Sequence, residues 1–256
     1  MKGVVVRIAI LALVARATAR TFTVINNCPF TIWPAIFTNL SVGTAVPEQP
    51  TGWEQGVLES VSFNVPNNWA AGRIWGRRDC NFSVNPGPSS CLDGGCNGGL
   101  LCDPHNGTGE TPVTVAEFTL SPNTNGVDFY DVSLVEGYNL PVRIDNNKGC
   151  RVSDCPIDLG PNCPTELKGP FNSTGFPVGC NSACSAGLGD PTNNPNCCTG
   201  THSTAATCPP SGVAFYSYFK GNCPNSMIYE YDESSGTPLW TCGGTPQPDY
   251  TVTFCP

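Results

Sequence analysis

The sequence predicts a mainly β, disulfide-stapled protein, and three observations point to this class. Short runs with alternating apolar and polar positions and many β-branched or aromatic side chains recur between turn residues, as in antiparallel sheets. The chain holds 16 cysteines, an even number that suits a disulfide framework. It also holds 28 glycines and 25 prolines, while only 12% of residues are charged. This composition favours turns and loops over long solvated helices.

The predicted elements follow from this pattern of alternation and turns. One short helix is expected where Val213, Tyr216 and Phe219 recur at helical spacing, with Ser211 as its N-cap and Gly221 near its end. The middle, 146–207, is rich in cysteine, Asn, Pro and Gly and has little apolar periodicity, so bridges must supply its order. Strands are expected at 21–26, 30–34, 57–65, 73–77, 113–120, 127–135, 140–144 and 250–254.

The first 19 residues have the pattern of a secretory signal peptide. Lys2 and Arg7 accompany an apolar run at 8–15, and the small residues at 17–19 form an A-x-A cleavage site. The run is too short to span a bilayer, and no later segment approaches ~20 apolar residues. We therefore expect a protein secreted to the cell exterior or cell wall, without a membrane span, whose mature chain begins at Arg20.

The remaining charge excludes some partners. Without the leader, 9 basic and 20 acidic residues remain, a net charge of −11, which disfavours nucleic acid and anionic membrane surfaces. Only two histidines are present, and the close cysteines lack the repeated C-x2-C spacing of zinc sites. We expect no metal and no cofactor, and assign the cysteines to disulfides whose pairing the spacing leaves open.

Further motifs suit an exported protein. No G-x-S-x-G motif occurs, and His105 and His202 are interpreted as solvated loop residues. Trp53, Trp69 and Phe171 are candidates either for stacking on sugar rings or for ordinary packing. N-linked glycosylation is expected at the four N-x-S/T sequons, Asn39, Asn81, Asn106 and Asn172.

Several motifs carry a family resemblance. They are Asn-Asn-Cys-Pro-Phe-Thr-Ile-Trp at 26–33, Gly-Arg-Ile-Trp-Gly-Arg at 72–77, Ala-Glu-Phe at 116–118, the segment 128–139, Cys-Cys-Thr at 197–199 and the C-terminal segment 250–256. Together they resemble thaumatin-like proteins over the whole mature chain, and the sixteen cysteines match in order. The resemblance implies a β-sandwich domain (20–77, 117–156 and 224–256), a disulfide-rich domain with a short helix (157–223) and a small loop-rich lobe (78–116).

The resemblance also implies a disulfide pairing and a cleft between the first two domains. The implied bridges are Cys28–Cys255, Cys80–Cys91, Cys96–Cys102, Cys150–Cys242, Cys155–Cys223, Cys163–Cys180, Cys184–Cys197 and Cys198–Cys208. Matched motif by motif, the cleft residues of the family fall on Arg73, Glu117, Asp131, Glu136 and Asp232. The chain departs from the pattern at Glu136, where plant members usually carry Asp. The extra methylene moves that carboxylate by ~1.5 Å on an unchanged backbone.

Alternation gives independent support for an acidic face. Glu117 points away from the face that holds Phe118, and Asp131 points away from the face that holds Val132. If the apolar faces form the core, the two acids project outward, side by side where their strands pair. Glu136 has the wrong parity for this face and requires a bulge or bend near Gly137.

Clustered carboxylates suit glycoside hydrolysis, because repulsion raises at least one pKa and so supplies an acid beside an ionised partner. We expect Glu117 as the acid, Asp131 or Glu136 as its partner, and Arg73 and Asp232 as residues that bind substrate. The resemblance implies a monomeric, weak endo-β-1,3-glucanase acting on β-1,3-glucan in wall remodelling or defence. Two alternatives stay open: a glucan-binding, antifungal module without turnover, and an inhibitor of secreted hydrolases.

Overall fold

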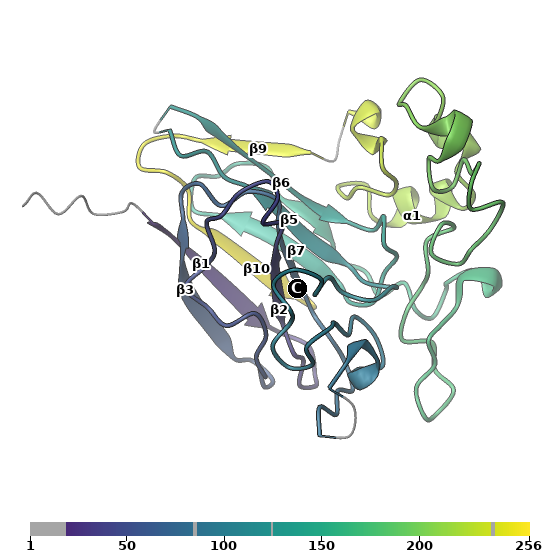
Figure 1. Cartoon of the computed structure of the whole chain (residues 1–256), viewed down its shortest axis with the longest axis horizontal. Helices are drawn as coiled ribbons and strands as arrows, with labels where there is room; N and C mark the ends of the chain where they lie inside the picture. The colour runs from purple at the N-terminus through teal and green to yellow at the C-terminus, as the bar shows by residue number, and fades with distance from the viewer. Residues whose placement is uncertain (1–18, 84–85, 124, 237–238) are drawn as a thin grey trace, which may run out of the picture.

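The computed structural model describes residues 19–83, 86–123, 125–236 and 239–256, so the expected leader lies outside the described residues except for Ala19. Within them, ten strands form two five-stranded sheets (Figure 1). The first sheet runs in the order β3 (Ser60–Pro66), β1 (Ala19–Asn26), β10 (Tyr250–Phe254), β7 (Val142–Asn146) and β8 (Ser153–Cys155). The second runs β2 (Ala35–Thr38), β4 (Gly72–Trp75), β5 (Val115–Thr119), β6 (Val127–Ser133) and β9 (Trp240–Gly243).

The sheets pack face to face through the apolar positions that alternation assigns to one face. Phe22 of β1, Phe118 of β5 and Tyr250 of β10 meet at the centre of the core, with the Phe22 and Phe118 ring centroids 4.9 Å apart. Trp69 stacks on Phe118 and is fully buried. Burial of each such side chain stabilises the fold by about 1.5–3 kcal/mol. The two mainly antiparallel sheets therefore form the sandwich predicted from the strand pattern.

The expected strand at 30–34 is wrong. In this segment only Ile32 makes a bridge, to Gln55, and the strand β2 begins at Ala35. Pro29 and Pro34 lack the backbone N–H that a ladder needs, so the segment cannot pair as a regular strand. The short strands β8 and β9 were not predicted, because three or four residues carry too little alternation to stand out.

Chain ends are held together at the centre of the first sheet. Strands β1 and β10 pair in parallel, and Cys28 beyond β1 is joined to Cys255 beyond β10 across 227 residues of sequence. All sixteen cysteines are bridged, in the pairs that the family resemblance implies. Closing so long a loop removes much entropy from the unfolded chain.

The disulfide-rich region lies at one end of the sandwich and contains the α-helix α1 (Tyr216–Asn222) (Figure 1). Ser211 is not its N-cap. The segment η4 (Pro210–Gly212) is a separate 3-10 turn, and Phe215 precedes the helix in a left-handed conformation at φ 59°. The other 3-10 turns are η1 (Pro88–Ser90), η2 (Thr165–Leu167), η3 (Gly200–His202) and η5 (Asp232–Ser235).

Strand β5 lies next to the expected boundary between the lobe and the sandwich domain. It begins at Val115, two residues before position 117, at which the expected sandwich domain resumes after the lobe. Among the described residues, none of the helices combines the length and the hydropathy that crossing a bilayer requires.

Candidate functional site: an acidic pocket on the second sheet

Three charged side chains lie in a row across the middle of the second sheet. Arg73 on β4 is directly opposite Glu117 on β5, and Glu117 is directly opposite Asp131 on β6. Residues on either side of them in sequence, such as Phe118 and Val132, point into the core. Because side chains alternate along a strand, the charged row projects from the outer face of the sheet. Directly opposite residues have Cβ atoms about 4.5–5.5 Å apart, so the three groups interact.

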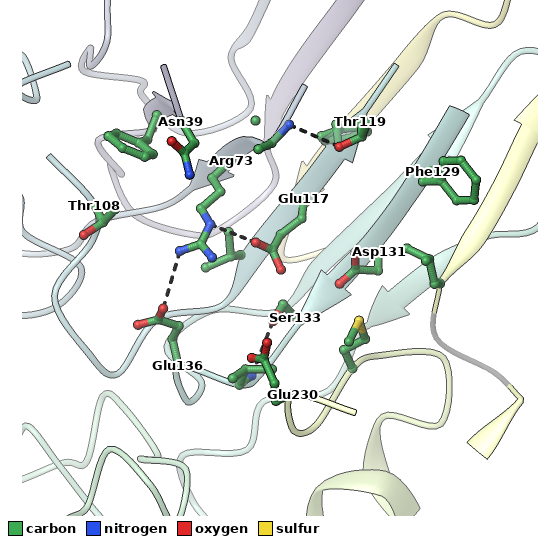
Figure 2. Close-up of a pocket in the computed structure, with 18 of the residues that line it drawn as sticks. Asn39, Arg73, Thr108, Glu117, Thr119, Phe129, Asp131, Ser133, Glu136 and Glu230 are labelled. Atoms are coloured by element: carbon green, nitrogen blue, oxygen red, sulfur yellow. Dashed lines mark hydrogen bonds and ion pairs between the residues drawn. The ribbon is translucent and has the colours of Figure 1, made fainter. Parts of the chain in front are cut away.

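Arg73 forms ion pairs with two carboxylates (Figure 2). Its Nε lies 2.8 Å from Oε1 of Glu117, and its Nη1 lies 3.4 Å from Oε1 of Glu136. Glu136 reaches the site through a turn in which the N–H of Gly137 donates to the carbonyl of Leu134 at 2.9 Å. Gly137 has φ +93°, a backbone conformation that residues with a side chain rarely adopt. This turn supplies the bend that the parity of Glu136 requires.

Asp131 is the buried acid of the site. Asp131 is only 4% exposed, and its Oδ2 has no hydrogen-bond partner among the described residues. Burial raises the pKa of Asp131 well above its ordinary value, and the charge of Glu117 raises it further. The positive charge of Arg73 lowers the pKa of Asp131 but does not cancel these two effects. Asp131 therefore holds a proton under conditions in which an exposed Asp is ionised.

Glu117 differs from Asp131 although the two are paired. Its side chain is 28% exposed, and it contacts Arg73 directly. Burial raises the pKa of Glu117 and the charge of Glu136 adds to this, while Arg73 and a hydrogen bond from Ser133 lower it. The net effect is a pKa of Glu117 raised above its ordinary value, but raised less than that of Asp131 because the guanidinium of Arg73 contacts Glu117 directly. The site thus combines a buried, protonated acid with a more accessible carboxylate.

These side chains line a pocket with a volume of about 640 Å³ (Figure 2), within the range of ligand sites. Sequence reasoning missed several of its other residues, which are Phe37, Asn39, Thr108, Phe129, Glu230 and Glu233. Phe129 lies two residues before Asp131 on β6, so the same alternation could have identified it. His105 is exposed, as expected, but also lines this pocket.

The aromatic residues considered from the sequence lie elsewhere. Trp69 is fully buried in the core, and Trp53 packs partly buried against it. Phe171 is exposed but does not line this pocket. The aromatic rings placed to contact a ligand here are those of Phe37 and Phe129, and Phe129 is 40% exposed.

Asp232 does not line the pocket, and its expected role as a binding residue is corrected. Its carboxylate is fully buried and accepts hydrogen bonds from the Tyr216 hydroxyl at 2.8 Å, Lys220 Nζ at 2.9 Å and the Ile228 N–H at 3.0 Å. It therefore fastens its loop to α1. The acids that this loop does bring to the pocket are Glu230 and Glu233.

In the described part of the chain, no group of three or more His, Cys, Asp or Glu side chains is arranged to hold a metal ion.

The fold and the pocket together define a disulfide-clamped β-sandwich protein with an arginine and several carboxylates on the outer face of one sheet. Comparison with known proteins identifies the family, since residues 26–256 match the model described as Thaumatin family. The chain belongs to the thaumatin family.

Its relatives cover nearly the full length of the chain. It is 39% identical over 259 residues to pathogenesis-related thaumatin-like protein 3.5 of Cryptomeria japonica, covering 98% of each chain. It is 38% identical over 246 residues to thaumatin-like protein 1 of Arabidopsis thaliana, covering 92% of this chain and 86% of that one. It is also 37% identical over 246 residues to a glucan endo-1,3-beta-glucosidase of Prunus avium, covering 94% and 92%.

Proposed function

We propose that this protein acts outside the cell as a weak endo-β-1,3-glucanase, with the acidic pocket as its active site. The observation that carries the proposal is that a buried Asp131, whose pKa burial raises well above its ordinary value, lies opposite a more exposed Glu117 that contacts Arg73. Similarity to the Prunus avium protein named as a glucan endo-1,3-beta-glucosidase supports the choice of substrate. Eight disulfides suit an oxidising, extracellular setting.

In this mechanism Asp131 is the general acid. Its carboxyl group donates a proton to the glycosidic oxygen as the bond to the anomeric carbon breaks, and the leaving sugar departs as an alcohol. Glu117 faces the positive charge that develops on the anomeric carbon, either attacking it or activating a water molecule. This assignment differs from the role of acid expected for Glu117 from the sequence, and it is supported by a pKa that is raised further for Asp131 than for Glu117.

Arg73 sets the charge state of the site. Its ion pair with Glu117 lowers the pKa of that carboxyl group relative to that of Asp131, and its Nη1 also lies beside Glu136. Phe37, opposite Arg73 on β2, and Phe129, two residues before Asp131 on β6, offer aromatic faces to the apolar C–H faces of sugar rings. Glu230 and Glu233 add acceptors for sugar hydroxyl groups on the side of the disulfide-rich region.

The experiment is reducing-sugar release from a linear β-1,3-glucan by the wild type, Asp131→Asn and Glu117→Gln. Each variant should lose at least about 100-fold in rate, since a general acid or base contributes 10²–10⁴-fold. Glu166→Gln is the matched control, because Glu166 is exposed in η2 and lies outside the pocket. Equal release by all four proteins would contradict the proposed active site.

A glucan-binding role without turnover is the second candidate. It is favoured by the double ion pair of Arg73, whose single positive charge offsets one of two carboxylate charges and leaves oxygens able to accept hydrogen bonds from a neutral polysaccharide. Calorimetry with the same glucan separates the two functions. Binding by the wild type without release of reducing ends would support the binding role alone.

A further inference from the structure

A second group of residues, unrelated to the acidic pocket, surrounds Asn172. Phe171 and Phe176 flank it on the two sides of a hairpin, closed by a bridge between Phe171 and Pro177 and by a hydrogen bond from the Asn172 N–H to the Phe176 carbonyl at 2.9 Å. Phe171 is 52% exposed and Phe176 is 41% exposed. Large aromatic rings gathered at the surface of a soluble protein indicate a site that something covers.

Asn172 lies at the border of two hollows. On one side a cavity of about 460 Å³ is lined by Asn172, Phe176, Phe30, Arg78 and Asp158, among others. On the other side a shallower hollow of about 750 Å³ is lined by Phe171 and Asn172 on the hairpin and by Asp79 and Asn81 on the small lobe. The hairpin projects from the disulfide-rich region beside that lobe (Figure 1). A group attached to Asn172 therefore has aromatic surface on both sides.

The Asn172 side chain is held in one orientation. Its Oδ1 accepts hydrogen bonds from the N–H of Thr174 at 3.0 Å, the hydroxyl of Thr174 at 2.7 Å and the N–H of Phe176 at 2.9 Å. Its Nδ2 donates to no group among the described residues. With the oxygen fixed against the turn, the nitrogen is the atom left to carry a substituent.

We propose that Asn172 carries an N-linked glycan whose first N-acetylglucosamine units lie against Phe176 and Phe30, so that the chain's own sugar covers the exposed aromatic rings. The sequon Asn172-Ser173-Thr174 is the acceptor signal. In the covalent step Nδ2 forms a bond to the anomeric carbon of a lipid-linked oligosaccharide diphosphate. The diphosphate leaves with the bonding electron pair, and Nδ2 loses one proton.

The chemistry of the cavity matches such a sugar. The apolar C–H face of a pyranose ring and the acetamido methyl group pack on aromatic rings, while the hydroxyl groups need polar partners. Asp158 is exposed at the edge and accepts a hydrogen bond from the buried Tyr138 hydroxyl at 3.3 Å, and Arg78 lies over the Phe30 ring at 5.9 Å. These groups offer an acceptor and a donor beside the aromatic surface.

The other sequons have different surroundings. Asn39 lines the acidic pocket on the second sheet and neither of these hollows. Asn81 borders only the shallower hollow, and the ring of Phe82 next to it packs against Trp33. Asn106 is exposed in a loop that neither hollow includes. A glycan at Asn106 therefore serves as the control for a sugar that extends into solvent.

The test uses the full-length protein secreted from a eukaryotic host, with glycopeptide mapping of each sequon and melting temperatures of matched variants. We expect a glycan at Asn172, and a fall in Tm of about 2–4 °C in Asn172→Gln, the shift that a modest contact produces in a chain of this size. In a Phe30→Ala/Phe176→Ala background the same Asn172→Gln change should lower Tm by less than half as much. Asn106→Gln should leave Tm unchanged in both backgrounds.

A second measurement needs no substitution. Chymotrypsin cleaves after exposed Phe residues that are not followed by proline, so the Phe171–Asn172 bond of the secreted protein should resist cleavage until the glycan is removed enzymatically under native conditions. An unmodified Asn172 in the secreted protein would overturn the proposal. So would an equal Tm loss on Asn172→Gln in both backgrounds together with unchanged cleavage after glycan removal, because the sugar would then extend into solvent.

Discussion

Glu117 and Asp131 are directly opposite each other on β5 and β6, yet one is 28% exposed and the other only 4%. Arg73 and water reach Glu117 from the open side of the pocket, while the segment that follows α1 lies beside Asp131, held by a bridge between Ser133 and Met227. Two acids with nearly the same position on a sheet thus acquire different protonation behaviour, which an acid and its ionised partner require.

Asp131→Asn should stabilise the protein at neutral pH. The folded-state pKa of Asp131 is raised, so the folded chain retains a proton that the unfolded chain releases, and stability falls as pH rises from about 4 through the folded pKa. Removing the titration should raise Tm by about 2–4 °C at pH 7 and leave it nearly unchanged at pH 3. Melting curves recorded across this pH range measure the effect on stability. They are compared with the activity loss proposed above.

Asp190→Asn is the matched control for this pH dependence. The pKa of exposed Asp190 is lowered by hydrogen bonds from the N–H and hydroxyl of Thr192. Ionised Asp190 therefore makes a small contribution that stabilises the folded protein above its unfolded pKa, the opposite of the effect of Asp131. A stability gain at pH 7 from both substitutions would mean that general loss of negative charge, and not the burial of Asp131, is responsible.

Arg73→Gln should raise the pKa of Glu117, because the guanidinium is the main charge that holds it down. If Glu117 must be ionised, the acidic limb of the pH–rate profile should move to higher pH, and the maximum rate should fall. Arg143→Gln is the control, since Arg143 is similarly exposed and paired with Asp145 on the other sheet. An unchanged acidic limb in Arg73→Gln would remove Glu117 from the mechanism.

Asp232→Ala should destabilise the fold by about 3–5 kcal/mol, because it leaves the Lys220 ammonium without its buried carboxylate partner. Chemical denaturation measures this loss. Glu233→Ala alters the next residue, which lines the pocket and is exposed, and should change stability by less than about 0.5 kcal/mol. Similar losses in the two variants would contradict the anchoring role assigned to Asp232.

Gly72→Ala should destabilise the sheet that carries the site. A Cβ at Gly72 would lie 2.2 Å from the Trp69 ring, so β4 would have to move and take Arg73 with it. Overpacking of this kind costs about 1–3 kcal/mol. Gly221→Ala is the contrasting substitution, because a Cβ there meets nothing within 4 Å and the residue lies within α1. It should stabilise the protein by about 0.5–1 kcal/mol, and denaturation curves would reveal opposite shifts.

The strand pattern and the cysteine count were readable in the sequence because each is a local or compositional signal. Alternation around Phe118 and Val132 predicted which face of each strand forms the core, and the same alternation directed Glu117 and Asp131 outward. The family motifs carried the disulfide pairing. Segments without periodicity were harder, and 30–34 and the start of α1 were wrong because proline and a left-handed Phe215 interrupt the chain there.

The sequence by itself determined a disulfide-clamped β-sandwich and the strands from which Arg73, Glu117 and Asp131 project. Only the tertiary structure decided which acid is buried, how Gly137 turns Glu136 toward Arg73, and that Asp232 fastens a loop while Glu230 and Glu233 reach the pocket. The physical reason is that side-chain direction follows from the local backbone, whereas burial and charge partners depend on segments that are distant in the sequence.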